Sequence, residues 1–285
     1  MIIDGKRASG EILEKLTKQI KNIKEQTNKV PGLGVIMVGE DAASKVYVRS
    51  KIKNCAKVGI LSKEVILPND TTEEELLLEI DKLNKDKEIH GVLVQLPLPR
   101  HISEKKVCEA IDINKDVDGF KAENIGKVLL GEEDGMVSCT PQGIMYLIDE
   151  LNIDLYGKNA VVLGRSNIVG KPISALLINR GATTTVCNSR TKNLKEILSL
   201  ADIVIVAIGQ PKFLKRDMVK EGAIVIDVGI NRVDGKLCGD VDYENVKDKV
   251  SHITPVPGGV GPMTIAMLLS NTLKSFCKEV EVNDK

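Results

Sequence analysis

The feature that most constrains this fold is a short apolar run that ends in glycine and leads into a helical pattern. The clearest case lies at 159–172, where Ala160–Leu163 predict a buried parallel strand and Gly164 opens a turn to a helix. Such a turn directs backbone N–H groups toward one point, which favours phosphate binding. The spacing Gly164-x-Ser166-x-x-x-Gly170 departs from the dinucleotide pattern G-x-G-x-x-G, since Ser166 replaces the second glycine and the third is displaced by one residue. Taken alone, it is equally compatible with an ordinary strand-to-helix turn.

The same alternation of strand and helix recurs along most of the chain. In the first half, helical segments separate three predicted strands, at 33–38, 64–67 and 91–96. In the second half, helices at 169–179 and 194–200 alternate with strands at 160–163, 183–186, 202–208 and 223–228. Alternating strands and helices are typical of α/β folds with parallel sheets, and 285 residues suffice for two domains. We therefore predict an α/β protein whose second half is a doubly wound sheet.

Local signals set the expected ends of several helices. Apolar residues at helical spacing predict a helix at 11–24, and Gly59 ends the one that follows the first strand. Thr71 and Thr72 each precede a glutamate by three residues, so two overlapping capping boxes open the next helix. Thr140 and Pro141 predict a helix start, with threonine as N-cap and proline at the first helical position, and we place the domain boundary near them.

The remaining segments are predicted to be less regular. The chain between Gly119 and Ser138 is poorly periodic, and 233–236 resembles a hairpin turn. The segment Pro255–Pro262 is too rich in proline and glycine for regular structure, and an apolar helix follows at 263–276.

Composition excludes several classes of partner and site. Forty basic residues balance forty acidic ones, so no overall charge favours nucleic acid or a membrane surface. We find no signal-peptide pattern and no apolar run of membrane-spanning length, which predicts a cytoplasmic protein. The six cysteines are scattered and the three histidines are far apart, so we expect reduced thiols and no metal site.

The end of the second strand of the doubly wound half indicates which dinucleotide is bound. In such folds an acidic residue there binds the adenosine ribose, whereas an arginine accommodates a 2′-phosphate. The segment Val186–Thr191 contains no acid, while Ser189 and Arg190 lie in it and Arg165 lies in the first turn. Guanidinium groups suit a dianionic phosphate, so we predict NADP rather than NAD. The alternative for Arg190 is a solvated surface side chain.

Candidates for the substrate site lie in the first half. Tyr47 and Lys51 are four residues apart, so they share one helix face, although a solvated lysine over a packed tyrosine is the simpler reading. Gln95 ends an otherwise apolar strand, where its amide must find hydrogen-bond partners or bind a ligand. Asp116 and Asp118 lie in a predicted turn, where aspartate commonly caps its own backbone, and this applies more strongly to Asp116.

Six sequence strings identify a family resemblance. They are Tyr47-Val-Arg-Ser-Lys51, Val94-Gln-Leu-Pro-Leu-Pro99, Asp116-Val-Asp-Gly119, Cys139-Thr-Pro-x-Gly143, Gly164-Arg-Ser-x-Ile-Val-Gly-Lys-Pro172 and Pro257-Gly-Gly-Val-Gly-Pro-Met-Thr264. Together, and in this order, they resemble the bifunctional methylenetetrahydrofolate dehydrogenase/methenyltetrahydrofolate cyclohydrolase family. The strings extend from about residue 44 to residue 264, nearly the whole chain.

The resemblance implies a role for each matching residue. Lys51 corresponds to the catalytic lysine, Gln95 to its hydrogen-bond partner, Tyr47 to a ring lying against the folate, and Asp118 to the carboxylate that holds the pterin. The implied cofactor positions are Gly164, Arg165, Ser166, Ser189, Arg190 and Ile230. The implied substrate positions further include Val94, Leu96, Pro257, Gly258, Gly259, Pro262, Thr264 and Ile265. Asn188 departs from the family pattern, in which many members have histidine before the serine.

The resemblance also implies an activity and an architecture. The activity is NADP-dependent oxidation of 5,10-methylenetetrahydrofolate to the methenyl form, followed by hydrolysis to 10-formyltetrahydrofolate. The implied homodimer has subunits with a folate domain at 1–138, rejoined by the carboxyl-terminal helix at 264–285, an NADP domain at 139–263, and a cleft between the two. The alternatives are a dehydrogenase without the hydrolytic step and a non-catalytic NADP-binding sensor.

Overall fold

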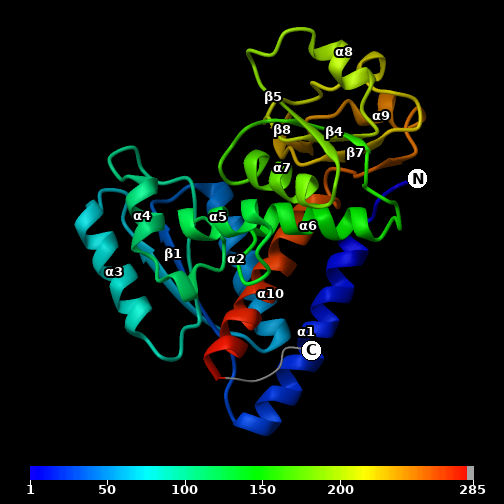
Figure 1. Cartoon of the computed structure of the whole chain (residues 1–285). Helices are drawn as coiled ribbons and strands as arrows, with labels where there is room; N and C mark the ends of the chain where they lie inside the picture. Colours follow the sequence, from blue (N-terminus) through cyan, green and yellow to red (C-terminus); the bar gives the residue numbers. More distant parts are fainter. Residues whose placement is uncertain (281–285) are drawn as a thin grey trace. The chain divides into compact units, whose positions relative to one another are not determined.

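The computed structural model describes residues 1–280 and divides the chain into two compact units (Figure 1). One unit combines Glu11–Ile125 with the chain from Ile265, and we call it the Lys51 unit. The other combines Met1–Gly10 with Gly126–Thr264, and we call it the Gly164 unit. Within the described residues, no helix combines the length and apolar character that a membrane span needs.

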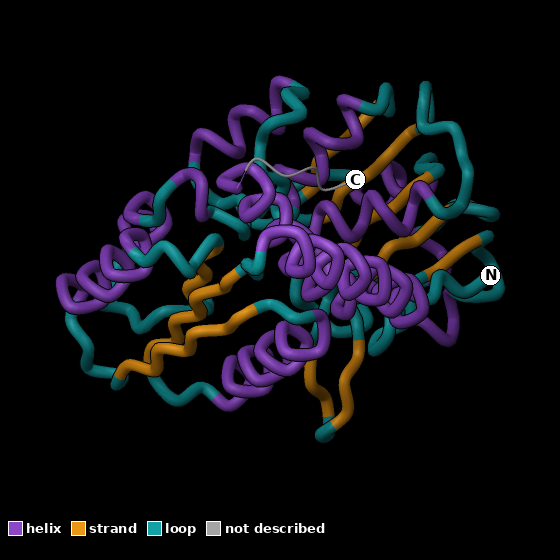
Figure 2. Tube along the Cα trace, turned by 90° about the horizontal axis from the view of Figure 1, so that it is seen from below, coloured by secondary structure: helices purple, strands orange, loops and turns teal. Residues whose placement is uncertain are grey.

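The Lys51 unit contains a parallel sheet of three strands in the order β2-β1-β3. β1 is buried throughout because helices pack on its sheet, α2 against β1 and β2 and α3 against β3. Strands and helices alternate along the trace in Figure 2. In chain order, the elements from the amino terminus to residue 130 are α1 (Gly5–Thr27), β1 (Gly32–Val38), α2 (Ala42–Val58), β2 (Leu61–Leu67), α3 (Glu73–Lys85), β3 (Gly91–Val94), α4 (Glu104–Ala110), the 3-10 turn η1 (Ile113–Lys115) and α5 (Ala122–Leu130).

The Gly164 unit contains five parallel strands in the order β10-β7-β6-β4-β5, which makes it doubly wound as predicted. Its central strands β4, β6 and β7 are almost wholly buried and apolar, as expected when helices cover both faces of a parallel sheet. The elements in this part of the chain are α6 (Cys139–Asp149), β4 (Asn159–Leu163), α7 (Gly170–Asn179), β5 (Thr183–Cys187), α8 (Leu194–Ser199), β6 (Ile203–Val206), η2 (Arg216–Met218), β7 (Ile224–Asp227), β8 (Asn231–Val233), β9 (Lys236–Cys238), α9 (Tyr243–Val246), β10 (His252–Ile253) and α10 (Val260–Val280). From Ile265 onward, α10 belongs to the Lys51 unit.

Several predicted boundaries are confirmed. Gly59 ends α2 with φ of 90°, a conformation that glycine adopts without strain. Thr72 and Glu75 form a capping box at the start of α3. Asp234 and Gly235 both have positive φ in the turn between the antiparallel strands β8 and β9, which agrees with the predicted hairpin. All six cysteines are free thiols.

Other boundaries were predicted wrongly. α6 begins at Cys139 with Ser138 as N-cap, so Pro141 is the third helical residue; proline is tolerated there because first-turn N–H groups have no helical partner. α10 likewise begins at Val260, inside the proline- and glycine-rich segment. α1 begins at Gly5 rather than residue 11, and α5 occupies part of the segment read as poorly periodic. Thr72, not Thr71, caps α3.

Candidate active site

Lys51 lies on the buried face of α2. The residues that point inward recur at helical spacing, and they are Ser44, Val48, Lys51, Cys55 and Val58. Only 7% of Lys51 is exposed, and its Nζ donates a hydrogen bond to Oε1 of Gln95 over 2.9 Å. The reading of Lys51 as a solvated surface lysine is therefore wrong. A buried amine held by a single amide is an arrangement suited to chemistry rather than to solubility.

Gln95 is held in one orientation at the carboxyl end of β3. Its backbone N–H donates to the Ile36 carbonyl over 2.8 Å, and its Nε2 donates to the Leu96 carbonyl over 2.6 Å. With Nε2 occupied as a donor, Oε1 is left to accept from Lys51. In the strand order β2-β1-β3, the ends of β1 and β3 flank the point where the winding direction reverses, the usual place for a ligand in such sheets.

Tyr47 lies one turn before Lys51 on α2 and is half-buried. Burial raises the pKa of its phenol, so the hydroxyl stays protonated at neutral pH. A neutral aromatic ring with part of its surface accessible is suited to lie against a flat ligand.

A pocket with apolar walls and two carboxylates lies beside the same strand end. The space between the atoms that line it is about 300 Å³, a figure that includes space open to solvent. Its lining consists of Val94, Leu96, Val107, Cys108, Ile111, Asp116, Asp118 and Phe120. Val94 and Leu96 flank Gln95 in sequence, so the pocket and the Lys51–Gln95 pair adjoin the same end of β3, although neither Lys51 nor Gln95 lines the pocket.

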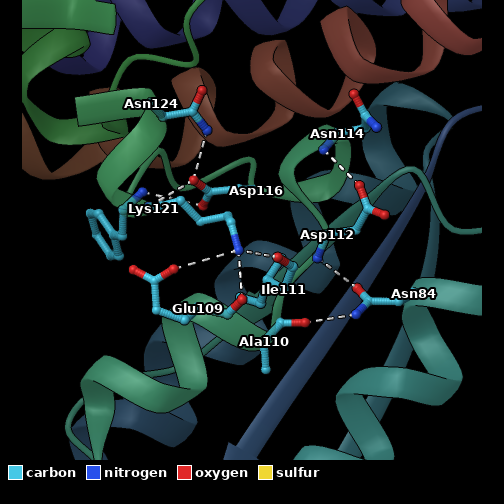
Figure 3. Close-up of polar contacts among 10 residues, drawn as sticks. Asn84, Glu109, Ala110, Ile111, Asp112, Asn114, Asp116, Lys121 and Asn124 are labelled. Carbon is cyan, nitrogen blue, oxygen red and sulfur yellow. Dashed lines mark hydrogen bonds and ion pairs between the residues drawn. The ribbon is translucent and has the colours of Figure 1, made fainter. Parts of the chain in front are cut away.

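The two carboxylates of this pocket have different surroundings. Asp116 is 1% exposed and accepts hydrogen bonds from the backbone N–H groups of Phe120 and Lys121, over 3.2 and 2.9 Å, and from Nδ2 of Asn124 over 2.8 Å (Figure 3). It closes its own turn, as predicted. Asp118 is half-buried on the pocket wall. Asp118 is therefore better placed than Asp116 to receive a ligand.

In the Gly164 unit, two glycines allow strand and helix to approach closely. Gly164 follows β4 with φ of 127°, and a Cβ there would lie 2.3 Å from the Ala207 carbonyl oxygen. A Cβ on Gly170 would lie 2.3 Å from the Gly164 carbonyl oxygen, so the displaced third glycine still serves helix–strand packing. Ser166 Oγ accepts the N–H groups of Val169 and Gly170 over 3.2 and 3.3 Å, at the start of α7. The unusual spacing thus forms a strand-to-helix turn of the dinucleotide-binding kind.

The end of β5 forms a tight turn that presents its polar residues outward. Asn188 Oδ1 accepts the backbone N–H of Arg190 over 3.0 Å, and the Asn188 carbonyl accepts that of Thr191 over 2.9 Å. Ser189 and Arg190 are exposed at the tip of this turn, and Arg165 is exposed after β4. β4 and β5 are parallel neighbours, so both arginines lie at carboxyl ends of adjacent strands. These residues suit a 2′-phosphate, since no carboxylate occupies the turn.

Two buried aspartates, missed by sequence reasoning, fix the loops around Ile230. Asp227 at the end of β7 accepts N–H groups from Gly229, Asp240 and Val241 over 2.9 to 3.0 Å. Asp240 accepts those of Ile208 and Gly209 and Nδ2 of Asn231 over 2.7 to 2.8 Å. Ile230 is 48% exposed between anchored neighbours. The available signal was an aspartate near a glycine in each of two segments, Asp227-Val-Gly229 and Gly239-Asp240. The glycine of each segment leaves room for the carboxylate of the other, since a Cβ on Gly239 would meet Asp227 and one on Gly229 would meet Asp240.

The buried carboxyl of Asp227 makes stability depend on pH. Burial raises its pKa from 3.8 to about 6, although the three N–H donors lower it. The folded protein therefore holds this proton more tightly than the unfolded chain, so this group's contribution is complete below pH 4 and is lost as pH rises through about 6. We expect Asp227 to lower the free energy of unfolding by roughly 3 kcal/mol across this window. Urea unfolding of wild type and Asp227→Asn at several pH values should show this slope only in the wild type, and parallel curves would contradict it.

The proline- and glycine-rich segment before α10 is held by backbone contacts. Gly258 has φ of 104°, and its carbonyl accepts the N–H of Lys6 over 2.9 Å. A Cβ on Gly259 would lie 2.6 Å from the Pro255 carbonyl oxygen. The hydroxyl of Thr264 shares a hydrogen bond with that of Thr140 over 2.9 Å. Pro257 is exposed, while Pro262, Thr264 and Ile265 are half-buried on or beside the first turns of α10.

Two family models match this chain. The catalytic-domain model of tetrahydrofolate dehydrogenase/cyclohydrolase matches residues 3–118, and the NAD(P)-binding-domain model of the same family matches residues 138–280. The chain belongs to the tetrahydrofolate dehydrogenase/cyclohydrolase family. The bifunctional protein FolD of Halalkalibacterium halodurans is 55% identical over 96% of this chain and 98% of its own length.

Solved structures of family members have the same fold along nearly the whole chain. The bifunctional FolD methylenetetrahydrofolate dehydrogenase/cyclohydrolase of Campylobacter jejuni is 50% identical with a TM-score of 0.96, over 98% of this chain and 99% of that one. The Trypanosoma brucei enzyme, complexed with NADP cofactor and inhibitor, is 37% identical with a TM-score of 0.96 over 99% of both chains. These matches confirm the predicted family, two-domain α/β fold, enzyme class and cofactor.

Proposed function

We propose that this enzyme oxidises 5,10-methylenetetrahydrofolate and hydrolyses the methenyl product at one site centred on Lys51. The observation that carries the proposal is the buried pair of Lys51 Nζ and Gln95 Oε1, 2.9 Å apart, beside the pocket that contains Asp118. Family membership supports both activities. A dehydrogenase without the hydrolytic step would have no evident use for a buried amine held in this way.

Asp118 is the proposed anchor of the pterin ring. A carboxylate accepts hydrogen bonds only, which matches the amino and ring N–H groups at one edge of a pterin. The neighbouring walls from Val107, Ile111 and Phe120 are apolar and suit the flat faces of the ring. Tyr47 is the proposed ring against the folate, and the remaining proposed folate positions are Val94, Leu96, Pro257, Gly258, Gly259, Pro262, Thr264 and Ile265.

NADP, when bound, supplies the hydride acceptor for the oxidation. The chain's part in that step is to orient the substrate and keep water away, because hydride transfer needs the two rings in register. The methenyl product is a cation, and water that adds to its bridge must lose a proton. The Nζ of Lys51 is the proposed acceptor of that proton. Gln95 holds the amine in place.

The cofactor is proposed to lie over the turn after β4. We assign to Gly164 and Ser166 the close approach of the backbone to the cofactor, and to Ile230 a contact with its nicotinamide side. Binding of the 2′-phosphate is assigned to Arg165, Ser189 and Arg190. This assignment is supported by the exposed arginines at the ends of β4 and β5.

Replacement of Arg190 should change cofactor preference. We expect Arg190→Ala to raise KM for NADP about tenfold, the loss of one or two charge-assisted hydrogen bonds, and to leave KM for NAD unchanged because NAD lacks the 2′-phosphate. Initial rates with each cofactor measure this. Arg232→Ala, a variant of an exposed arginine that bonds only the hairpin carbonyl of Gly235, is the matched control. Equal losses with NADP and NAD would remove Arg190 from the phosphate site.

One spectrophotometric experiment tests the function as a whole. Methylenetetrahydrofolate is mixed with enzyme and NADP, and absorbance is followed at the wavelengths of reduced cofactor and of the methenyl form. We expect reduced cofactor to appear without accumulation of the methenyl form, because hydrolysis removes it. Accumulated methenylfolate would favour the monofunctional alternative. No turnover with intact NADP binding would favour the sensor.

Three further predictions from the sequence stay open. They are a homodimer, which sedimentation would decide by showing twice the mass of one chain; a cytoplasmic location, which fractionation of cells would decide; and domain bounds at 138/139 and 263/264, which limited proteolysis would decide. The open edge of the sheet at β5 supports the dimer, because Thr185 and Val186 are exposed there and an unpaired edge strand readily pairs with another chain.

A further inference from the structure

The carboxyl end of α4 lacks the usual glycine cap. Its C-cap residue, Ile111, is extended with φ of −68° and ψ of 135°, so the chain leaves the helix without the left-handed residue that normally turns back over the last carbonyls. The last four carbonyls of a helix have no partner within it, and they carry the negative end of its dipole. This end therefore needs donors from elsewhere, and a cation is the most favourable donor.

Lys121 supplies that cation. Its Nζ donates to the carbonyl of Glu109 over 2.6 Å and to that of Ile111 over 2.7 Å, and the Glu109 carboxylate lies 4.0 Å away (Figure 3). The carbonyl between them, that of Ala110, accepts Nδ2 of Asn84 over 2.8 Å. The Lys121 side chain is only 13% exposed. In Figure 3 its ammonium reaches from the Asp116 turn to the end of α4.

The backbone of Lys121 is tied to the turn that carries Asp118. Its N–H donates to Oδ2 of Asp116 over 2.9 Å, and the same carboxylate accepts Nδ2 of Asn124 over 2.8 Å. One residue thus connects the end of α4 with the turn at 115–120, by its side chain to the first and by its backbone to the second.

These two segments supply most of the lining of one pocket. The last turn of α4 and its cap give Val107, Cys108 and Ile111, and the turn gives Asp116, Asp118 and Phe120. We propose that Lys121 is a positioning residue for the folate: it fixes the spacing between these two walls, so that Asp118 meets the pterin edge while the apolar wall meets its face. This rests on the proposed binding of the pterin at Asp118 and assigns no contact between Lys121 and substrate.

Replacement of the ammonium should loosen folate binding without slowing the chemistry. In Lys121→Met the two carbonyls lose a charged donor, and Asp118 keeps its side chain but not its fixed place. We expect KM for methenyltetrahydrofolate in the cofactor-free hydrolysis assay to rise about tenfold, with kcat within about threefold of wild type, a loss comparable to one charged hydrogen bond. NADP affinity should not change, because the cofactor residues belong to the Gly164 unit.

Three companion variants make the result decisive. Lys121→Arg retains a cation with several donors and should restore KM to near the wild-type value. Lys105→Met removes an exposed lysine from the same helix and should have no effect. Lys121→Gln retains a neutral donor and carries the test if the methionine variant does not fold.

Each outcome bears on one proposal. Wild-type protein that neither binds nor hydrolyses methenylfolate contradicts the proposed function itself. If the wild type is active, an unchanged KM in folded Lys121→Met overturns the positioning role. If the methionine variant does not fold, an unchanged KM in Lys121→Gln overturns it instead. A loss of kcat at unchanged KM overturns it as well. A raised KM restored by arginine supports the role.

Discussion

Lys51→Met is expected to abolish hydrolysis of methenyltetrahydrofolate while leaving NADP binding intact. Methionine matches the length and apolar stem of lysine but cannot accept a proton, and a positioned base contributes about 10²- to 10⁴-fold to such a step. Lys51 is 7% exposed and its Nζ donates to Gln95. A lysine on the protein surface could not reach this buried position to replace it. The measurement is loss of methenyl absorbance over time, beside a titration of NADP by fluorescence.

Two further variants separate chemistry from packing. Lys53→Met alters an exposed lysine two residues away on α2 and should hydrolyse at the wild-type rate. Gln95→Leu keeps the amine but removes the side-chain oxygen that accepts its hydrogen bond, so it should slow hydrolysis less than Lys51→Met does. Leaving the Gln95 oxygen unpaired in Lys51→Met costs about 1–3 kcal/mol of stability, which thermal unfolding would register separately. Hydrolysis at the wild-type rate in folded Lys51→Met would remove the lysine from the mechanism.

Sequence patterns predicted the sheets well because a strand buried on both faces forms a recognisable apolar run in the sequence. The runs at 33–38 and 160–163 are continuous and apolar, that at 223–228 is apolar apart from Asp227, and each contains a strand of a parallel sheet. Helix starts were harder. Ser138 is the N-cap of α6 but its side chain does not cap the first turn, so the proline at 141 misled the prediction by suggesting a later start.

The roles of the site residues differ in how far they can be predicted from the sequence. Asp116 was predictable as a turn-closing carboxylate from its neighbours alone, because its donors lie four, five and eight residues away. The Lys51–Gln95 pair was implied only by the family resemblance and not by local pattern, since these residues are 44 apart and meet only because β1 and β3 are adjacent. Asp227 and Asp240 escaped prediction for the same reason, because their partners come from three separate loops.

Asp118→Ala is expected to raise the folate requirement of both reactions roughly a hundredfold. Two hydrogen bonds from a pterin edge to a carboxylate contribute about 3 kcal/mol together, taken at the lower end of the range for charged hydrogen bonds, which is roughly a hundredfold in affinity. Alanine offers no acceptor in a pocket whose other walls are largely apolar. Because the amino edge of the pterin lies at the other end of the ring system from the one-carbon bridge, kcat at saturating folate should fall much less than KM rises. Initial rates against folate concentration, in the dehydrogenase and hydrolase assays separately, measure both constants.

The neighbouring aspartate, Asp116, provides the control for this prediction. Asp116 is 1% exposed and binds three donors of its own turn, so Asp116→Asn should lower the free energy of unfolding by roughly 3 kcal/mol through lost charged hydrogen bonds. Asp118 is half-buried, and its replacement should leave the melting temperature near that of the wild type. A folate KM that does not change in Asp118→Ala would exclude this residue from the pterin site. A large loss of stability in both variants would show instead that the two carboxylates share one structural role, so that the pocket would be left without its proposed anchor.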